Sequence, residues 1–321
     1  MKKILILFGG NSPEHNISCK SAKTILENID KEKYDITTVG IDKENNWYIF
    51  NDNIDKLTNN WKQSNIKIIN NIVPFLKEFD KVFPIIHGNP EENGNLQGLF
   101  NLFNISYVGT DLLGSIISYD KELTKIICNN YNIPQVPYII IKENKKIKNI
   151  PIDFPVIIKP AKSGSSIGIN IANNIKELNK YLKEAFIYDN KVIIEKYIKS
   201  RELECAILEN KKLLVSPIGE IKSSNNFYDY EAKYEKDSKL SIPASIPKEL
   251  SKQIQELSLK IFNILELSTL SRIDFLYDYN NNKLYFNEVN TMPGFTNISM
   301  YPLLFNNLGI STKDLITKLI N

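Results

Sequence analysis

Two acidic residues stand in runs of sequence that otherwise have the composition of buried β-strands. Asp274 lies in SRIDFLY and Glu288 in YFNEVN, and a short asparagine-rich segment centred on Asn281 separates the two runs. Asparagine tolerates the left-handed backbone of tight loops, so this segment predicts a β-hairpin. With the loop centred on Asn281, the two acids face each other across the strands. Arg272 and Asn290 then form the next pair on the same face.

Two facing carboxylates predict a cation between them. Like charges directly opposite each other in a sheet are destabilising, whereas Mg²⁺ binds hard oxygen ligands and usually also holds substrate phosphates. The face therefore offers Asp274, Glu288 and Asn290 as magnesium ligands. Arg272 beside them can stabilise a phosphate or an oxyanion. The alternative is a solvent-exposed hairpin with surface charges, and a register shift of one residue would place the acids on opposite faces.

A second segment, IIKPAKSGSSIG, has the residue types of an anion-binding loop. Lys159 ends an apolar run, and small residues follow over 163–166. Backbone N–H groups of such a loop can surround an anion, while the lysine supplies a point charge. The chain contains neither GxxxxGK[ST] nor GxGxxG, so neither a P-loop nor a dinucleotide-binding turn is predicted. Glu195 and Glu202 are candidates to hydrogen-bond an adenine amine and ribose hydroxyls, or else surface charges.

The elements that would position these residues follow two patterns. In the first part of the chain, strands at 3–10, 34–42 and 81–88 alternate with helices at 18–29 (N-cap Ser18), 94–104 and 119–132. This alternation predicts an α/β layer with a mainly parallel sheet. From about residue 136, short strands surround one helix, and a long amphipathic helix at 248–266, the hairpin and a short last helix follow, which is typical of α+β domains. We place the domains at 1–109, 110–197 and 198–321.

The composition argues against several other classes of protein. The chain has 321 residues, 42% hydrophobic and 24% charged, and its net charge of +3 is spread along the sequence. Without a dense basic block, neither nucleic acid nor an anionic membrane is predicted as a partner. Cys19, Cys128 and Cys205 are far apart and lack CxxC spacing, which disfavours structural zinc and a disulfide framework. With no signal-peptide pattern and no apolar stretch approaching ~20 residues, we expect a cytoplasmic enzyme.

Together these segments resemble the D-alanine–D-alanine ligases of the ATP-grasp superfamily. The resemblance runs over nearly the whole chain, in the same order: LFGGNSPEHNIS, VFPIIHG, NLQGLF, YVGTDLLGS, YDKELTK, VIIKPAKSGSSIGI, FYDYEAKY, SRIDF and FNEVNTMPGFTNISMYP. It implies a three-domain fold in which two α+β domains clamp ATP. It implies that ATP phosphorylates the carboxylate of one D-alanine, and that the amine of a second D-alanine attacks the acyl phosphate, for peptidoglycan precursor synthesis.

The resemblance also implies which residues take part. The catalytic group would be Glu14, Ser165, Tyr234, Arg272 and Gly294. The group around ATP would be Lys121, Lys159, Ser166, Glu195, Lys196, Tyr197, Ile198, Glu202 and Lys233. The contacts to the amino-acid substrates would be His87 and Ser299, and the ligands of two Mg²⁺ ions, or of Mn²⁺ in their place, would be Asp274, Glu288 and Asn290.

Within these groups, the resemblance implies three specific contacts at the amino acids. Glu14 would hold the ammonium of the first D-alanine, and Ser299 the carboxylate of the second. Arg272 and the backbone N–H of Gly294 would form the oxyanion site.

One loop departs from the family pattern. The family usually reads HGPxGEDGTxQG, and this chain has HGNPEENGNLQG. His87 and Glu92 match, but Asn93 replaces an acid and Asn95 a threonine, which bears on affinity for the first amino acid. For His87, the alternative to a substrate contact is a strand-end histidine whose hydrogen bonds go to the backbone.

Several functions remain to be distinguished. A second substrate of D-serine or D-lactate would make a related ligase of the same family, although the retained EAKY favours a dipeptide product. A catalytically degenerate ATP-binding protein is a further alternative, but the three metal ligands and the arginine are all present. Another ATP-grasp carboxylate–amine ligase should lack FYDYEAKY. A homodimer is compatible with the resemblance, since relatives commonly pair through the N-terminal domain.

Overall fold

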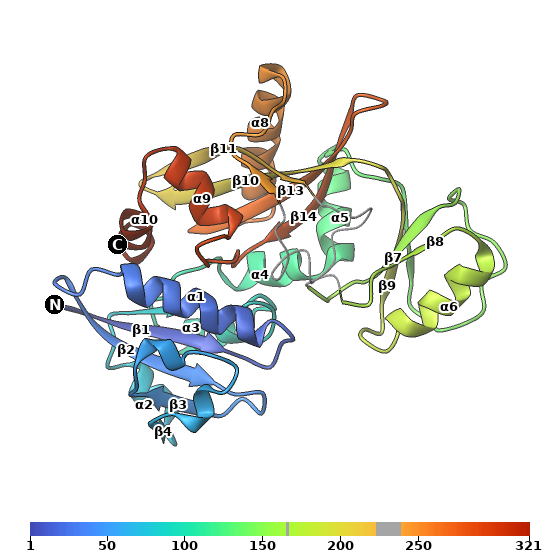
Figure 1. The fold of residues 1–321 in the computed structure, drawn as a ribbon. Helices are drawn as coiled ribbons and strands as arrows, with labels where there is room; N and C mark the ends of the chain where they lie inside the picture. The colour runs from blue at the N-terminus through green and yellow to red at the C-terminus, as the bar shows by residue number, and fades with distance from the viewer. Residues whose placement is uncertain (165–166, 223–238) are drawn as a thin grey trace.

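The computed structural model contains three β-sheets, each covered by helices, and describes residues 1–164, 167–222 and 239–321 (Figure 1). The first sheet lies at the lower left of Figure 1, the second at the right and the third at the top. Within these described ranges, no helix is long and apolar enough to cross a membrane.

The first sheet is mixed and mostly parallel. Its strands are, in spatial order, β4 (Ile66–Ile68), β3 (Trp47–Phe50), β2 (Tyr34–Ile41), β1 (Lys2–Gly9) and β5 (Lys81–Pro84). β1 pairs in parallel with both of its neighbours, and its last six residues are all buried. Alternate side chains of β1 enter two different hydrophobic cores. A central strand covered on both faces explains why KILILF is continuously apolar.

Helices α1 (His15–Asn28), α2 (Ile72–Leu76) and α3 (Asn95–Phe103) pack on this sheet, and two further helices, α4 (Leu112–Tyr119) and α5 (Lys121–Asn130), follow them in the chain. The short elements η1 (Ile54–Lys56) and η2 (Trp61–Gln63) come between α1 and α2. The prediction of one helix at 119–132 missed α4, which ends at Tyr119. The side chain of Asp120 accepts hydrogen bonds from the N–H groups of Glu122 and Leu123 and so begins α5.

The predicted N-cap of α1 is wrong. The helix begins three residues earlier, at His15, so Ser18 lies inside it. The Ser18 hydroxyl accepts a hydrogen bond from the N–H of Gly9 (2.8 Å) and donates one to the carbonyl of Ile85 (2.5 Å). Ser18 therefore fixes α1 to the carboxyl ends of β1 and β5.

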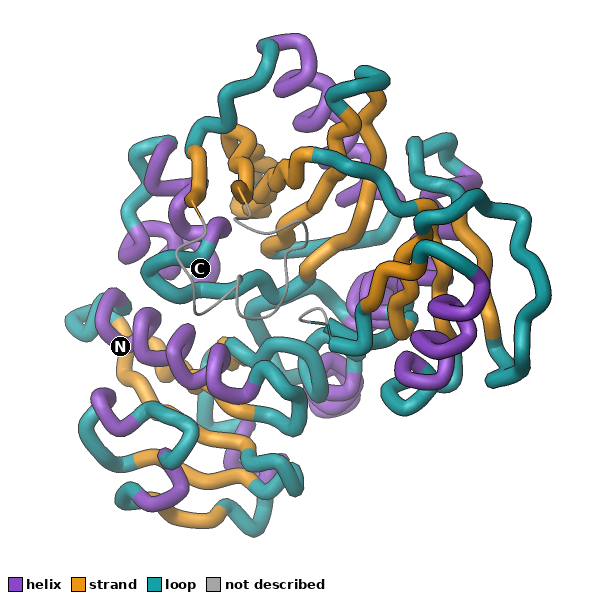
Figure 2. The backbone as a smooth tube through the Cα atoms, turned by 45° about the vertical axis from the view of Figure 1, so that its right-hand side comes forward, coloured by secondary structure: helices purple, strands orange, loops and turns teal. Residues whose placement is uncertain are grey.

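The second sheet is antiparallel. Its order is β6 (Tyr138–Ile141), β9 (Val192–Lys196), β7 (Val156–Pro160) and β8 (Asn170–Ala172). Helix α6 (Ile175–Ala185) packs on this sheet through its buried apolar side chains, and Asn174 caps its first turn. Figure 2 shows this sheet and its helix standing apart from the first sheet.

The third sheet carries the hairpin. Its order is β12 (Lys239–Ser241), β11 (Lys212–Lys222), β10 (Arg201–Asn210), β13 (Leu270–Asp278) and β14 (Lys283–Asn290). Helix α8 (Lys248–Ile264) packs on one face, and α9 (Met300–Asn307) and α10 (Thr312–Ile320) on the other. Although α4 and α5 precede the second sheet in the chain, α4 contacts β14 and α5 contacts α8.

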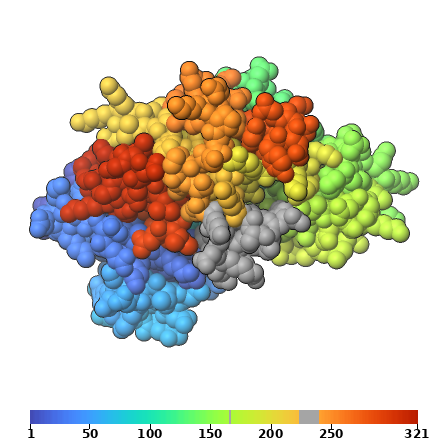
Figure 3. All heavy atoms as spheres, turned by 45° about the horizontal axis from the view of Figure 1, so that its top comes forward, coloured from blue at the N-terminus to red at the C-terminus, as the bar shows by residue number. Residues whose placement is uncertain are grey.

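One hydrophobic core joins distant parts of the chain. It contains Ile25 of α1 and Leu315 of α10, together with side chains of β1, β10 and α9. An ion pair between Lys313 and Asp30 (3.4 Å) also bridges α10 and the end of α1. Figure 3 shows the last residues lying against the first ones. The first and third sheets are therefore held together by shared apolar burial.

Candidate active site

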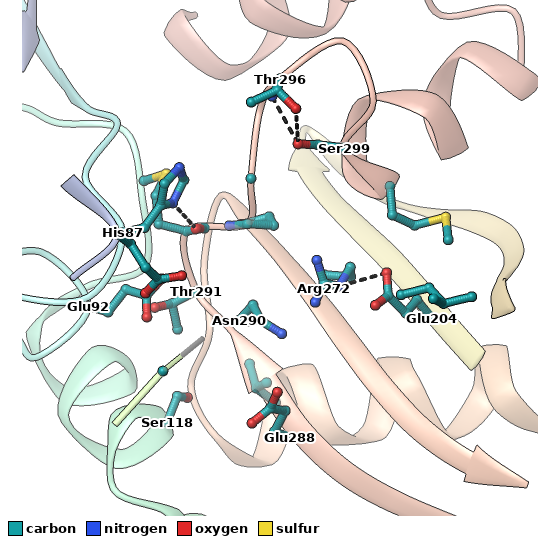
Figure 4. Close-up of a pocket in the computed structure, with 18 of the residues that line it drawn as sticks. His87, Glu92, Ser118, Glu204, Arg272, Glu288, Asn290, Thr291, Thr296 and Ser299 are labelled. Atoms are coloured by element: carbon teal, nitrogen blue, oxygen red, sulfur yellow. Dashed lines mark hydrogen bonds and ion pairs between the residues drawn. The ribbon is translucent and has the colours of Figure 1, made fainter. Parts of the chain in front are cut away.

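Two adjoining cavities contain the predicted site residues. The first has a volume of ≈ 340 Å³ and lies between the first and third sheets (Figure 4). The second has a volume of ≈ 410 Å³ and lies between the second and third sheets. Glu204, Ile221 and Glu288 line both cavities and so form a shared wall.

The hairpin pairs its polar residues as predicted, but with a different loop. The two acids lie opposite each other, and so do Arg272 and Asn290. Nearer the loop, Phe275 pairs with Phe286, which shifts the register by one residue and leaves Asn287 as an extra residue in β14. The assumption of a loop centred on one asparagine is therefore wrong, and the bulge at Asn287 restores the predicted pairs.

The bulge also decides which face the acid occupies. Phe286 is buried in the core beneath the sheet, and strict alternation would turn Glu288 toward that same core. Because Asn287 is inserted, Val289 enters the core instead, and Glu288 faces the cavities. β14 is the last strand of its sheet, but the N–H of Phe286 donates to the carbonyl of Pro134 (2.8 Å), so this edge is covered.

Arg272 is the centre of a charged cluster at the shared wall. Its Nε and Nη2 donate to the two oxygens of Asp274, both at 2.8 Å. Its Nε also lies 3.0 Å from Oε2 of Glu204 (Figure 4). The side-chain amide of Asn290 donates to Oδ2 of Asp274 at 2.9 Å. Paired hydrogen bonds of this kind fix the plane of the guanidinium group and aim it into the first cavity.

The donor chemistry at the hairpin fits a magnesium ion. Asp274, Glu288 and Asn290 present two carboxylates and an amide, the hard oxygen donors that Mg²⁺ prefers. In this arrangement the acids are compensated by Arg272 and by Lys121, whose Nζ lies 3.7 Å from Glu288. Among the described residues, no group of three or more His, Cys, Asp or Glu side chains could hold a metal ion. The third protein ligand would therefore have to be the amide.

Glu195 is buried between two lysines in the second cavity. Its Oε1 lies 2.7 Å from Nζ of Lys125 and its Oε2 lies 2.7 Å from Nζ of Lys159. Burial alone would raise the pKa of Glu195, but the two ammonium groups together outweigh burial and lower that pKa to about 2. Burial lowers the pKa of Lys159, and the carboxylates of Glu195 and Glu288 reverse this and raise it.

The end of β7 and the loop that follows it contact residues of both cavities. Nζ of Lys121 donates to the carbonyl of Ser163 at 2.7 Å, and Nζ of Lys159 donates to the side chain of Asn287 at 3.3 Å. A Cβ placed on Gly164 would be 2.9 Å from a carboxylate oxygen of Glu14. Glycine therefore permits the loop to approach the start of α1 closely, and the first and second sheets meet there.

The first cavity has an acidic end. Glu14 and Glu92 both line it, Glu14 buried and Glu92 half-buried. Burial, and then repulsion from Glu14, raise the pKa of Glu92 to about 8. A cationic group bound here would be favoured by both carboxyl groups.

His87 lines the same cavity, yet both of its ring nitrogens have partners in the protein. Nδ1 lies 2.9 Å from the carbonyl oxygen of Met292, and Nε2 lies 3.0 Å from the hydroxyl of Ser21. Burial lowers the pKa of His87. This geometry favours the alternative of a histidine with protein partners over a direct hydrogen bond to substrate.

The turn after β14 closes the first cavity. A Cβ placed on Gly294 would be 2.9 Å from the hydroxyl oxygen of Ser299. That oxygen accepts a hydrogen bond from the N–H of Thr296 (2.9 Å) and contacts the Thr296 hydroxyl (2.8 Å; Figure 4). The turn therefore holds the Gly294 backbone and the Ser299 side chain at one place.

The structure brings together all of the predicted site residues that it describes. The first cavity is lined by Glu14, His87, Lys121, Arg272, Glu288, Asn290, Gly294 and Ser299. The second is lined by Lys159, Glu195, Lys196, Tyr197, Ile198, Glu202, Asp274 and Glu288. The predictions for Ser165, Ser166, Lys233 and Tyr234 lie outside the described residues.

Several residues that line or support the two cavities were not predicted, among them Lys125, Glu204 and Ser21. Lys125 forms an ion pair with Glu195. It follows Lys121 by four residues, so both fall on the same face of α5, which was a signal in the sequence. Glu204 lies between apolar residues of β10, as Asp274 does in β13, and the two are paired in register. For Ser21, inside a helix, we find no signal in the sequence.

The three-sheet architecture, with two cavities that meet at the third sheet, is that of the ATP-grasp ligases. Family models described as "D-ala D-ala ligase N-terminus" and "D-ala D-ala ligase C-terminus" match residues 3–110 and 127–321. The chain belongs to the D-alanine–D-alanine ligase family. It is an ATP-dependent, ADP-forming ligase.

Relatives and solved structures agree over nearly the full length. A D-alanine–D-alanine ligase of Caldicellulosiruptor bescii is 43% identical, covering 99% of this chain and 94% of that protein. D-alanine–D-alanine ligase B of Clostridium tetani is also 43% identical, covering 99% and 92%. Among solved structures, the VanG D-Ala:D-Ser ligase from Enterococcus faecalis superposes with a TM-score of 0.86 at 34% identity, covering 99% and 98%. The D-alanine–D-alanine ligase from Coxiella burnetii gives 0.87 at 30%, covering 99% and 92%.

Proposed function

We propose that this chain joins two D-alanine molecules, with ATP in the second cavity and both amino acids in the first. The observation that carries the proposal is the shared wall of Glu204, Ile221 and Glu288 between the two cavities. A phosphoryl group passes from ATP to a carboxylate at such a junction without either substrate leaving its site. Catalysis of this kind depends on positioning and on neutralising charge.

The second cavity binds the nucleotide in this proposal. Lys159 leaves Glu195 for the phosphates, and Lys121 approaches them from the neighbouring helix. The adenine lies against residues 195–198, and Glu202 hydrogen-bonds the ribose. The support for this placement is that all of these residues except Lys121 line the second cavity.

The metal belongs beside the phosphates. Asp274, Glu288 and Asn290 would hold magnesium, and we propose two ions. A bound Mg²⁺ neutralises charge on the transferring phosphoryl group. The supporting observation is the register of the hairpin, which places these three hard donors on one face.

The first cavity orders the two amino acids. Glu14, with Glu92 nearby, holds the ammonium of the first D-alanine. Once its carboxylate is phosphorylated, the amine of the second D-alanine attacks the acyl carbon, and inorganic phosphate leaves. Arg272 and the N–H of Gly294 stabilise the oxyanion that forms. Ser299 holds the carboxylate of the second D-alanine.

A second candidate function differs only in the second substrate. The solved D-Ala:D-Ser ligase is as similar in fold as the D-alanine–D-alanine ligase structure. D-serine in place of the second D-alanine is therefore the alternative to test, and D-lactate can be tested in the same assay. A degenerate ATP-binding protein is disfavoured by the intact cluster around Arg272 and Asp274.

Mass spectrometry of the product tests the proposal directly. Purified protein is incubated with MgATP and D-alanine, then with D-alanine and equimolar D-serine or D-lactate. We expect D-alanyl-D-alanine as the main product, with one phosphate released per dipeptide. Absence of dipeptide and of phosphate release at millimolar D-alanine would falsify the proposal. A dominant mixed product would instead select the alternative.

Three further statements remain predictions. We propose domain boundaries near residues 109 and 197, and the N-terminal family model ends close to the first of them, at residue 110. A cytoplasmic location is proposed from the sequence pattern, and a homodimer from the family resemblance.

A further inference from the structure

A serine and a histidine from the layer of the first sheet make hydrogen bonds to the turn that follows β14. Ser21 lies in α1 and His87 follows β5, and both are buried. The carbonyl of Met292 can only accept, so Nδ1 of His87 donates to it (2.9 Å). Nε2 of the neutral ring then accepts from the Ser21 hydroxyl (3.0 Å), whose oxygen accepts from the N–H of Phe295 (3.2 Å). The donor and the acceptor of each of these three hydrogen bonds are thereby determined.

The 292–295 turn, which these hydrogen bonds hold, carries the proposed oxyanion donor, the N–H of Gly294. Met292 and Phe295 are the two anchored residues, and Gly294 lies between them. A Cβ built on Gly294 would come within 2.9 Å of the hydroxyl of Ser299, the proposed carboxylate contact, so the Gly294 backbone lies close to Ser299. A displacement of the anchored turn therefore moves both groups at once. Ser21 itself does not line the first cavity, so any effect it has on the reaction passes through the turn or through His87, which does line it.

We propose that Ser21 and His87 are positioning residues: they hold the 292–295 turn, and through it the Gly294 N–H and the Ser299 hydroxyl, at the geometry that the attack of the second D-alanine requires. The inference rests on the proposed function, because the turn matters only if a second amino acid binds there. It assigns His87 an indirect role in place of a substrate contact.

Ser21→Ala tests these hydrogen bonds without changing a residue that lines the cavity. It leaves the N–H of Phe295 and Nε2 of His87 without their partner, so the turn loses one anchor. We expect kcat/KM for D-alanine to fall about tenfold to a hundredfold, since misplacement of about 1 Å can cost up to a hundredfold. We expect the KM for MgATP, measured at saturating D-alanine, to stay within about twofold, because the second cavity does not contact the turn.

Ser18→Ala is the matched control. Ser18 is a fully buried serine of the same helix whose hydroxyl, like that of Ser21, makes two hydrogen bonds. Both of its partners, the backbone groups of Gly9 and Ile85, lie at the carboxyl ends of strands of the first sheet. It should lower the melting temperature by an amount similar to Ser21→Ala while keeping the D-alanine kinetics of the wild type. Equal loss of kcat/KM in both variants would overturn the proposal, because the effect would then be general destabilisation.

Substitutions of His87 separate an indirect role from a direct one. The side-chain amide of His87→Asn can lie where Nδ1 lies and still donate to Met292, whereas His87→Ala cannot. We expect kcat/KM for D-alanine to be at least tenfold higher in His87→Asn than in His87→Ala. Loss of D-alanine affinity in both His87 variants with unchanged kinetics in Ser21→Ala would overturn the proposal in favour of a substrate contact. Failure of the proposed function is distinguishable, since the wild type would then make no dipeptide.

Discussion

The pair of lysines around Glu195 gives a quantitative prediction. Glu195 and Lys125 are nearly inaccessible to solvent, with side chains 3% and 2% exposed. A pKa of about 2, against 4.5 for an unperturbed glutamate, corresponds to about 3 kcal/mol of stability at neutral pH. Lys125→Met keeps the apolar length of the side chain but removes one of the two ammonium groups. We expect the free energy of unfolding at pH 7 to fall by about 1.5–3 kcal/mol, the contribution of one hydrogen bond to a charged group.

The sign of the pH dependence follows from the lowered pKa. The stabilisation by the Glu195 carboxylate is fully present above pH 4.5, the ordinary value, and is lost as the pH falls toward 2. In Lys125→Met the pKa of Glu195 rises, so less stability remains to be lost over this range. The difference in unfolding free energy between wild type and variant should therefore be largest above pH 4.5 and shrink below it, as measured by urea denaturation.

The same substitution should weaken ATP binding. With Lys125 gone, Glu195 depends on Lys159 alone, and Lys159 is then less available to the phosphates. We expect the Kd of a non-hydrolysable MgATP analogue to rise about tenfold in calorimetry, equivalent to about 1.4 kcal/mol. The control is Lys62→Met, which removes the partner of the buried Asp42 (2.6 Å) at the first sheet and lies outside both cavities. Its ATP affinity should not change.

Two results would refute this reasoning. One is a stability difference between wild type and Lys125→Met that stays constant from pH 7 to pH 3, because the lysine would then act by packing alone. The other is equal ATP affinity of the two proteins, which would show that Glu195 does not compete with phosphate for Lys159.

Three other substitutions test separate parts of the structure. Glu288→Gln should abolish phosphate release while circular dichroism and the melting temperature stay close to wild type; an active variant would refute the metal role. Arg272→Lys, which cannot make the paired hydrogen bonds, should lower kcat about 10²–10³-fold, as measured by an assay of ADP formation. Gly114→Ala would place a Cβ 2.6 Å from the carbonyl oxygen of Glu266 and should cost about 1–3 kcal/mol of unfolding free energy. Its control, Gly98→Ala, meets nothing nearer than 3.9 Å and should be neutral or stabilising by up to about 1 kcal/mol.

Local pattern predicted most of the elements of the fold. The apolar run of β1 and the period of α8 and α10 come from side chains whose burial is set by their own strand or helix. The packing of α4 and α5 against the third sheet did not follow from the sequence. Their partners, such as Ile261 and Phe262, lie more than a hundred residues away, and periodicity does not say which face meets which.

The site was predicted where a motif or a register argument applied. The predicted pairing of Asp274 with Glu288 was correct, although it depends on a bulge at Asn287 that nothing in the sequence indicated. Glu204 and Lys125 were missed because a single charged residue in an apolar strand or helix has many explanations. Only the fold shows that their partners, Arg272 and Glu195, line the two cavities.

The core shared by α1 and α10 has a consequence for biosynthesis. Ile25 leaves the ribosome nearly three hundred residues before Leu315, which at roughly 5–20 residues per second is on the order of 15–60 s. During that interval, the apolar side of α1 has no C-terminal partner to cover it. The nascent first sheet should therefore be a client for chaperones that bind exposed apolar helices, and release should coincide with the synthesis of α9 and α10.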